Sequence, residues 1–176
     1  MLPQFLAPPI AVANYANSGA SSGSFLGSSL WTNITSRWKA GDYLIVQFGH
    51  NDKGVSDATV QANLEKYVTA AKAAKVTAII VSPPARVGFS GGVETSQSSL
   101  HAAAAQKAAA AQSVGYIDLT ALSVAWYNTL GSEAAALKFH ANGDKTHTNL
   151  PGADKLASLV AGAIKTQNLA LAKYLR

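Results

Sequence analysis

The sequence has 176 residues, of which 48% are hydrophobic and 13% charged, so its composition is that of a globular protein and not of a disordered chain. It contains no cysteine, which excludes disulfides, thiolate metal sites and a cysteine nucleophile. The net charge is +5, but eleven of the fourteen basic residues are lysines scattered singly along the chain, a pattern that argues against a nucleic-acid groove.

Length and hydropathy predict a single domain, residues 1–176, without a membrane span. No apolar run approaches the roughly 18 residues that a transmembrane helix needs. Met1 is followed at once by Leu2-Pro3-Gln4, so the basic region of a signal peptide is absent. The mild positive charge suits an acidic polymer as substrate, and solubility alone explains it equally well.

In chain order, residues 1–9 resemble the last turns of a helix, 10–14 predict a strand, and a loop of small residues follows to residue 24. Helical patterns alternate with strands from there, while a loop at 85–95 contains Gly91-Gly92. The further expected strands are 44–48, 76–81 and 114–119, and the expected helices are 26–38, 56–74, 98–112, 120–130, 132–139 and 151–167. This alternation predicts an α/β fold, a three-layer α/β/α arrangement with a mainly parallel, flavodoxin-like sheet.

The strand at 44–48 ends in a polar cluster that includes Asn51. Ligands of open α/β sheets bind outside the carboxyl ends of the strands, so Asn51 is a candidate side-chain donor in an oxyanion hole. The alternative is a turn-forming asparagine after a strand. The loop at 14–24 is a candidate for presenting backbone amides to a ligand, or else a flexible glycine-serine turn.

Asp144 and His147 form a second candidate pair, in the loop before the last helix. A histidine that acts as general base needs an acceptor on its far ring nitrogen, and a spacing of three within a tight loop supplies one. The alternative is a turn former beside a surface histidine. His101 is expected on the surface of an alanine-rich helix, and His140 is expected to be structural.

Neither a metal nor another cofactor is proposed. The His, Asp and Glu residues lack metal-ligand spacing, and the glycine-rich loops lack both the lysine of a P-loop and the spacing of a dinucleotide fingerprint.

Together these pieces resemble the SGNH (GDSL) hydrolases and, within them, the rhamnogalacturonan acetylesterase-like group. The resemblance covers residues 2 to about 165 and rests on three short motifs in order, Asn14–Gly19, Gln47–Asp52 and Asp144–Thr148, the last followed by Pro151-Gly152-Ala153. It implies an oxyanion hole formed by the Gly19 backbone amide and the Asn51 side chain. It also implies that His147 is the general base and that Asp144 orients it.

The resemblance further implies a secreted, extracellular esterase that removes acetyl groups from a pectin-like acetylated polysaccharide or a small ester. Three basic residues are candidates for meeting uronate carboxylates, with ordinary solvated side chains as the alternative: Lys53, Arg86 and Lys145.

The family's nucleophile, a serine in a Gly-Asp-Ser motif at the end of the first strand, has no counterpart in the sequence. The resemblance therefore predicts a chain without the first strand and the nucleophile loop, and a weak or inactive esterase. Three alternatives stay open. They are a non-catalytic carbohydrate-binding pseudoenzyme, a flavodoxin-like nucleotide or phosphate binder, and a replacement nucleophile at Ser18, Ser21 or Ser22.

In the family's fold the first strand lies between the strands that match residues 10–14 and 44–48, so its loss leaves backbone groups unpaired. We expect one of two repairs. Either these two strands pair directly, or another segment or subunit fills the gap, which makes a homodimer formed by strand exchange an expected partner state.

Overall fold

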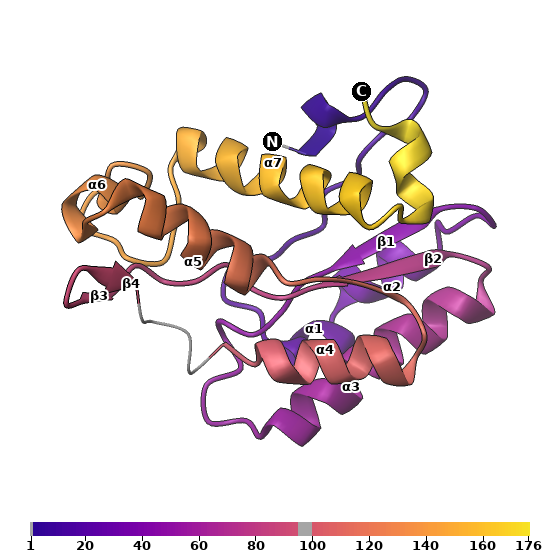
Figure 1. The fold of residues 1–176 in the computed structure, drawn as a ribbon. Helices are drawn as coiled ribbons and strands as arrows, with labels where there is room; N and C mark the ends of the chain where they lie inside the picture. Colours follow the sequence, from indigo (N-terminus) through magenta and orange to yellow (C-terminus); the bar gives the residue numbers. More distant parts are fainter. Residues whose placement is uncertain (1, 95–99) are drawn as a thin grey trace. The chain divides into compact units, whose positions relative to one another are not determined.

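The computed structural model of the chain describes residues 2–94 and 100–176, and its elements fall into two units (Figure 1). The sheet unit consists of Ala13–Pro83 and Ser99–Asp118. The helical unit consists of Met1–Val12, Pro84–Ser98 and Leu119–Arg176. A single domain over residues 1–176 stays a prediction.

The sheet unit is built on a parallel sheet of order β1-β2-β5, with β1 at Tyr43–Val46, β2 at Thr77–Val81 and β5 at Gly115–Ile117. In register, Tyr43 lies opposite Thr77 and Ile79 opposite Gly115. The crossovers contain α3 (Asp57–Ala73) and α4 (Ala102–Ala111), since parallel neighbours need a long connection. The predicted α/β class with a mainly parallel sheet is confirmed.

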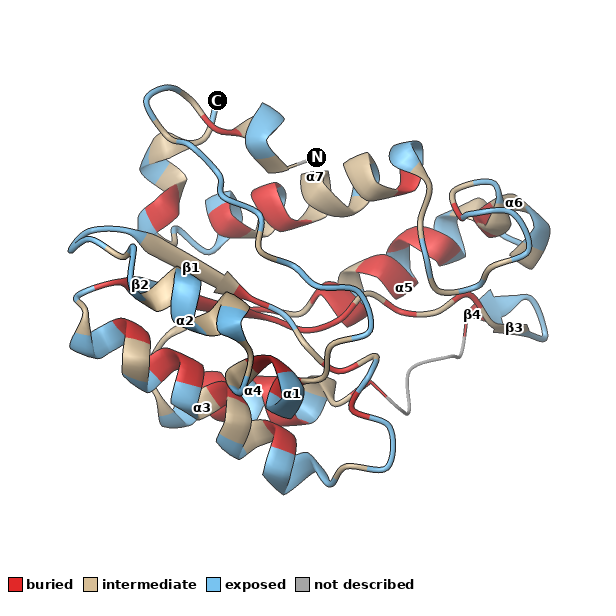
Figure 2. Cartoon of the chain, turned by 180° about the vertical axis from the view of Figure 1, so that it is seen from behind, coloured by how far each residue is buried: buried red, intermediate tan, exposed pale blue. Residues whose placement is uncertain are grey.

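The helix predicted over 56–74 forms as α3, and it packs through one apolar stripe. Ser56 caps this helix by accepting from the Thr59 amide, and the stripe is buried in the core of the sheet unit together with Val46 and Ile80. The buried residues of α3 are Val60, Leu64, Tyr67, Val68 and Ala71. Helices α3 and α4 lie side by side (Figure 1), and red buried stretches run along α3 and β2 in Figure 2.

Small residues bring α4 close to its neighbours. Its buried side is made of alanines, Ala104, Ala105, Ala108 and Ala109. The single helix predicted over 26–38 is instead α1 (Ser22–Leu26) and α2 (Ser29–Thr35). The break falls at Gly27-Ser28, where the Ser28 side chain caps α2.

The expectations for the first two strands are wrong in part. Residues 10–14 form no strand, and Val12 is 44% exposed, so the predicted direct pairing with the strand after it does not occur. Among the described residues β1 pairs with β2 alone. As an edge strand it is only half-buried at Leu44 and Ile45, not buried on both faces. Filling of this edge by another subunit stays a prediction.

The helical unit contains a hairpin at one of its predicted loops. The strands β3 (Phe89–Ser90) and β4 (Val93–Glu94) are antiparallel. Gly91 and Gly92 join them with φ of 59° and 82°, as a two-residue turn with positive φ at both positions requires. The prediction of a loop over 85–95 is therefore wrong at residues 89–94, where this hairpin lies.

The other elements of the helical unit are η1 (Leu2–Phe5), α5 (Leu119–Leu130), α6 (Glu133–Leu137), α7 (Leu150–Thr166) and η2 (Ala170–Tyr174). Its core contains Trp126, which packs edge-on against Phe139. The chain ends meet here, since Leu6 forms an antiparallel bridge with Leu175. No helix within the described ranges is both long and apolar enough to cross a bilayer.

Candidate active site

Asn51 lies in a tight loop between β1 and α3, which we call the Asn51 loop (Gly49–Gly54). Two successive turns shape it, because the Asp52 amide donates to the Gly49 carbonyl and the Val55 amide to the Asp52 carbonyl, both at 3.1 Å. The exposed Asn51 side chain donates from Nδ2 to the Ala20 carbonyl at 3.3 Å. The structure therefore brings Asn51 next to Ala20, the residue that follows Gly19, and an oxyanion pair requires such proximity.

The segment containing Gly19 is an ordered loop, the Gly19 loop (Asn14–Ser21). Asn14 Oδ1 accepts from the Ala16 amide at 3.0 Å, and the Ala20 amide donates to the Asn17 carbonyl at 3.2 Å. Gly19 sits in the second of these turns with φ +78°, a conformation that side-chain-bearing residues rarely adopt. These hydrogen bonds favour a loop that presents amides over a flexible glycine-serine linker.

A buried carboxylate joins the Asn51 loop to the start of α1, directly after the Gly19 loop. Asp52 is 1% exposed, and its Oδ1 accepts from the Ser22 amide at 3.0 Å and from the Ser22 hydroxyl at 2.6 Å. Asn63 Nδ2 donates to the same hydroxyl, and Tyr67 donates to the Ser22 carbonyl at 2.7 Å. Burial, and then the Asp52 charge, raise the pKa of Tyr67 and keep it a donor.

This carboxylate bears on the question of a replacement nucleophile. The Ser22 hydroxyl is buried and donates a hydrogen bond to Asp52, and the Ser21 hydroxyl caps α1. Ser22 is therefore a structural donor at the start of α1. Sequence reasoning missed the role of Asp52, although its position directly after Asn51 was a usable signal.

His147 and Asp144 meet in the helical unit. His147 Nδ1 lies 2.6 Å from Asp144 Oδ2, and Asp144 Oδ1 accepts from the His147 amide at 2.8 Å and from the Thr146 amide. These donors, the His147 ring first, lower the pKa of Asp144. Because Nδ1 faces the carboxylate, Nε2 is the nitrogen left to accept a proton, and the His147 side chain is 74% exposed.

Asn149 closes the loop that contains this pair. Its side chain caps α7 by accepting from the Gly152 amide at 3.1 Å, and its Nδ2 donates to the carbonyls of Lys138 and His140 at 2.8 and 3.2 Å. At Gly152 a Cβ would lie 2.1 Å from the Phe139 carbonyl oxygen, so only glycine fits. The asparagine before a Leu-Pro-Gly helix start was the sequence signal for this closure.

Two further histidines, His140 and His101, are held by contacts within their units. His140 is buried with Nε2 2.9 Å from the Tyr127 hydroxyl, and burial lowers its pKa. The interpretation of His140 as structural agrees with this environment. His101 does not lie on the surface of the alanine helix, as predicted. It precedes α4, because its φ of 54° is incompatible with a helical position, and its side chain is 11% exposed.

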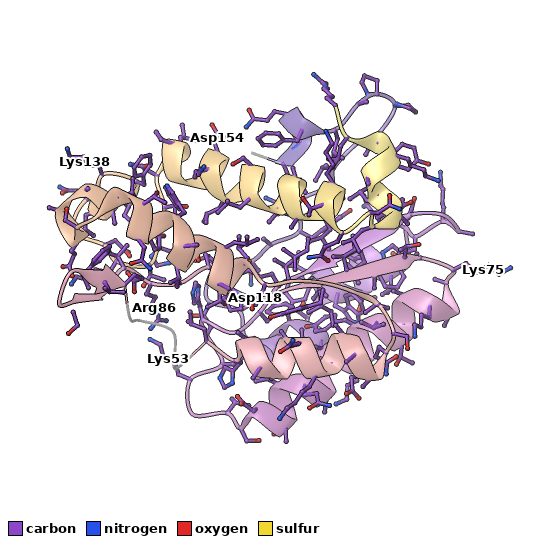
Figure 3. The ribbon with its side chains drawn as sticks, viewed as in Figure 1. Lys53, Lys75, Arg86, Asp118, Lys138 and Asp154 are labelled. Atoms are coloured by element: carbon purple, nitrogen blue, oxygen red, sulfur yellow. The ribbon has the colours of Figure 1, made fainter. Side chains whose placement is uncertain are left out.

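The basic candidates have different surroundings. Lys145 pairs with Glu133 at 2.6 Å, an interaction that lowers the pKa of Glu133. Lys53 is an exposed member of the Asn51 loop, and Arg86 is half-buried in the helical unit. Lys75, which is not one of the candidates, extends away from the ribbon just beyond α3 (Figure 3). Within residues 2–94 and 100–176, no three His, Asp or Glu side chains gather as the ligands of a metal would.

Each unit thus holds one part of the predicted site. The sheet unit offers amide donors at Asn51 and Gly19, and the helical unit offers a histidine oriented by a carboxylate. Such groups stabilise a developing oxyanion and move a proton, respectively. Their roles as catalytic residues stay predictions.

Comparison with known proteins identifies relatives over nearly the whole chain. Residues 1–155 match the sequence model of the GDSL-like Lipase/Acylhydrolase family. The chain is 30% identical over 173 residues to the probable rhamnogalacturonan acetylesterase YesY of Bacillus subtilis (strain 168), covering 92% of this chain and 80% of that protein. It is also 30% identical over 189 residues to the rhamnogalacturonan acetylesterase RhgT of the same organism, covering 98% and 82%.

A solved structure agrees with these matches. The crystal structure of the Bacillus subtilis protein YxiM superposes with a TM-score of 0.90 at 28% identity, over 97% of this chain and 50% of that one. The resemblance to SGNH hydrolases is therefore confirmed.

Proposed function

Because the chain belongs to the GDSL-like lipase/acylhydrolase family, we propose that it is a carbohydrate esterase acting by serine acyl transfer. Two relatives at 30% identity are named as rhamnogalacturonan acetylesterases, one of them as probable. For this chain we propose the corresponding substrate, an acetylated pectin-like polysaccharide, and secretion of the parent enzyme to meet that polymer. The observation that carries the proposal is the contact of 2.6 Å between His147 Nδ1 and Asp144, which leaves Nε2 open.

The proposed reaction begins when His147 Nε2 takes the proton of a serine hydroxyl, whose oxygen attacks the acetyl carbonyl carbon. The carbonyl oxygen becomes an oxyanion and accepts from the Gly19 amide and from Asn51 Nδ2. The sugar alkoxide then leaves with the proton from His147, and water releases acetate from the serine by the same route. Asp144 holds the ring in the tautomer that this sequence of steps needs.

The 176 residues contain no Gly-Asp-Ser. We therefore propose that this chain by itself is a weak or inactive esterase. In the best-studied serine triad, loss of one member leaves only about 10³ to 10⁴-fold over the uncatalysed rate. The absence of the motif favours, as a second candidate, a carbohydrate-binding pseudoenzyme. An in-frame Gly-Asp-Ser in the DNA upstream of the Met1 codon would decide for the esterase.

The test is hydrolysis of 4-nitrophenyl acetate and of acetylated rhamnogalacturonan by the unsubstituted 176-residue chain, called the parent below, and by its variants His147→Ala and Asn51→Ala. Asn33→Ala, at an exposed asparagine of α2, is the matched control. We expect a low parent rate that Asn51→Ala reduces further, by as much as about 10² to 10³-fold where the residual rate depends on the oxyanion hole. Asn33→Ala should leave the rate unchanged.

Fast hydrolysis by the parent, abolished in both site variants, would show that another nucleophile exists and that the proposed inactivity is wrong. A parent rate equal to that of buffer, with retained binding of the acetylated polymer, would favour the pseudoenzyme.

A further inference from the structure

Leu100 and His101, two consecutive residues, contact the two ends of the first turn of the Asn51 loop, at Gly49 and Asp52. At Gly49, where the loop begins, a Cβ would lie 2.4 Å from the Leu100 carbonyl oxygen, so the two backbones are in direct contact. At Asp52, three residues on, the carbonyl oxygen lies 3.0 Å from His101 Nε2. Asn51 stands between these two contacts.

The His101 ring is held from its other side as well. Its Nδ1 lies 2.6 Å from Asp57 Oδ1, and Asp57 is the first residue of α3, directly beyond the loop and its Ser56 cap. The ring is 11% exposed, whereas the Asp57 side chain is 59% exposed. His101 therefore bridges the first turn of α3 and the backbone of the Asn51 loop. Both partners can only accept, so both contacts are hydrogen bonds when each ring nitrogen carries a proton.

This histidine does not serve the helix that it precedes. It occupies the N-cap position of α4, where Ser, Thr, Asp or Asn normally accepts a hydrogen bond, yet its side chain makes no capping bond. It also adopts φ +54°, in the left-handed region that non-glycine residues seldom occupy, although histidine is found there more often than most side chains. A cap residue without a capping hydrogen bond is explained by the contacts that its ring makes elsewhere.

We propose that His101 is a positioning residue for Asn51. The amide and the carboxylate of Asp52 are hydrogen-bonded, and its carbonyl, which already accepts from the Val55 amide, is held a second time by the His101 ring, so this contact restrains the peptide next to Asn51. The Asn51 side chain then keeps its place beside the Ala20 carbonyl. This inference rests on the proposed function of Asn51 as an oxyanion donor, because only such a donor needs a fixed position.

The experiment compares the intact parent chain with His101→Asn. Asparagine tolerates the left-handed backbone and can cap α4, but it is too short to reach both Asp57 and Asp52. Ser113→Asn is the matched control, since Ser113 follows the other end of α4, is exposed and has φ +48°. The readouts are hydrogen exchange of the Asp52 and Val55 amides and the NMR resonances of the Asn51 side-chain amide.

In His101→Asn we expect exchange of these two amides to accelerate by about tenfold or more and the Asn51 resonances to shift, while the Ile80 core amide stays protected. Ser113→Asn should change none of these readouts. Asp57→Asn removes the carboxylate beside His101 Nδ1 and should reproduce part of the effect. Asp57→Glu keeps a carboxylate and should behave like the parent.

Unchanged loop exchange and unmoved Asn51 resonances in both His101→Asn and Asp57→Asn would overturn the inference. These readouts do not depend on hydrolysis. The loop can respond to His101→Asn as expected while Asn51→Ala has no effect on esterase activity. That pair of results would refute the proposed function of Asn51 and leave the positioning of its side chain intact.

Discussion

Asp144 and His147 lie three positions apart in one loop, and their contact determines which ring nitrogen of His147 is open. The carboxylate can only accept, so Nδ1 must carry the proton. In Asp144→Asn the new amide can donate to Nδ1 and reverse this arrangement. We predict that ¹⁵N NMR of His147 at a pH where the ring is neutral will show the proton on Nδ1 in the parent and mainly on Nε2 in the variant.

Lys145→Ala is the control for this tautomer. Lys145 lies in the same loop as Asp144, and the substitution removes its ion pair with Glu133 of α6 but leaves the carboxylate of Asp144 in place. The His147 tautomer should then match the parent. A parent-like tautomer in Asp144→Asn as well would contradict the orienting role of Asp144.

The same contact makes stability depend on pH. Hydrogen bonds from His147 and Thr146 lower the pKa of Asp144 below its ordinary value of 3.8. A lowered native pKa means that the stabilisation is present above the ordinary value and is lost as pH falls through the native one. The difference in unfolding free energy between parent and Asp144→Asn should therefore shrink from pH 5 downwards, as urea unfolding can measure. A difference that grows on acidification would contradict this assignment.

At the scale of elements, α7 must approach the Phe139 backbone for Asn149 to close the loop. Gly152→Ala would place a Cβ 2.1 Å from the Phe139 oxygen, so the first turn of α7 must move. We predict a loss of about 1–3 kcal/mol of unfolding free energy, as overpacking usually causes. The measurement is urea denaturation, with ¹⁵N spectra to follow the His147 loop.

Gly162→Ala is the matched control in the same helix. A Cβ there meets nothing within 4 Å, and alanine is the better helix former, so we expect a gain of about 0.5–1 kcal/mol. Equal effects of the two substitutions would show that the close contact at Gly152 does not constrain α7.

For the whole molecule, sequence reasoning succeeded where the interaction is local. The α3 stripe repeats with helical period, and Asp144 and His147 are three residues apart, so both patterns are visible in a short window. It failed at residues 10–14, because a strand needs a neighbour that local sequence does not specify. The His101 contact with Asp52 spans 49 positions, and a separation of that size leaves no periodic signal.

Net charge is also a property of the whole molecule, and it predicts how the chain meets an acidic polymer. The scattered lysines give +5 without a cluster, so attraction to a polyuronate is a summed, long-range effect that salt screens over about 8 Å at physiological ionic strength. Lys53→Gln and Lys75→Gln each lower the charge from +5 to +4 at exposed positions, one in the Asn51 loop and one beyond α3. We predict that both weaken binding to polygalacturonate equally at low salt and that the effect vanishes at high salt, as titrations at several salt concentrations can measure. A salt-resistant loss confined to Lys53→Gln would instead show that Lys53 contacts a uronate directly, because a short-range contact is screened far less than a summed field.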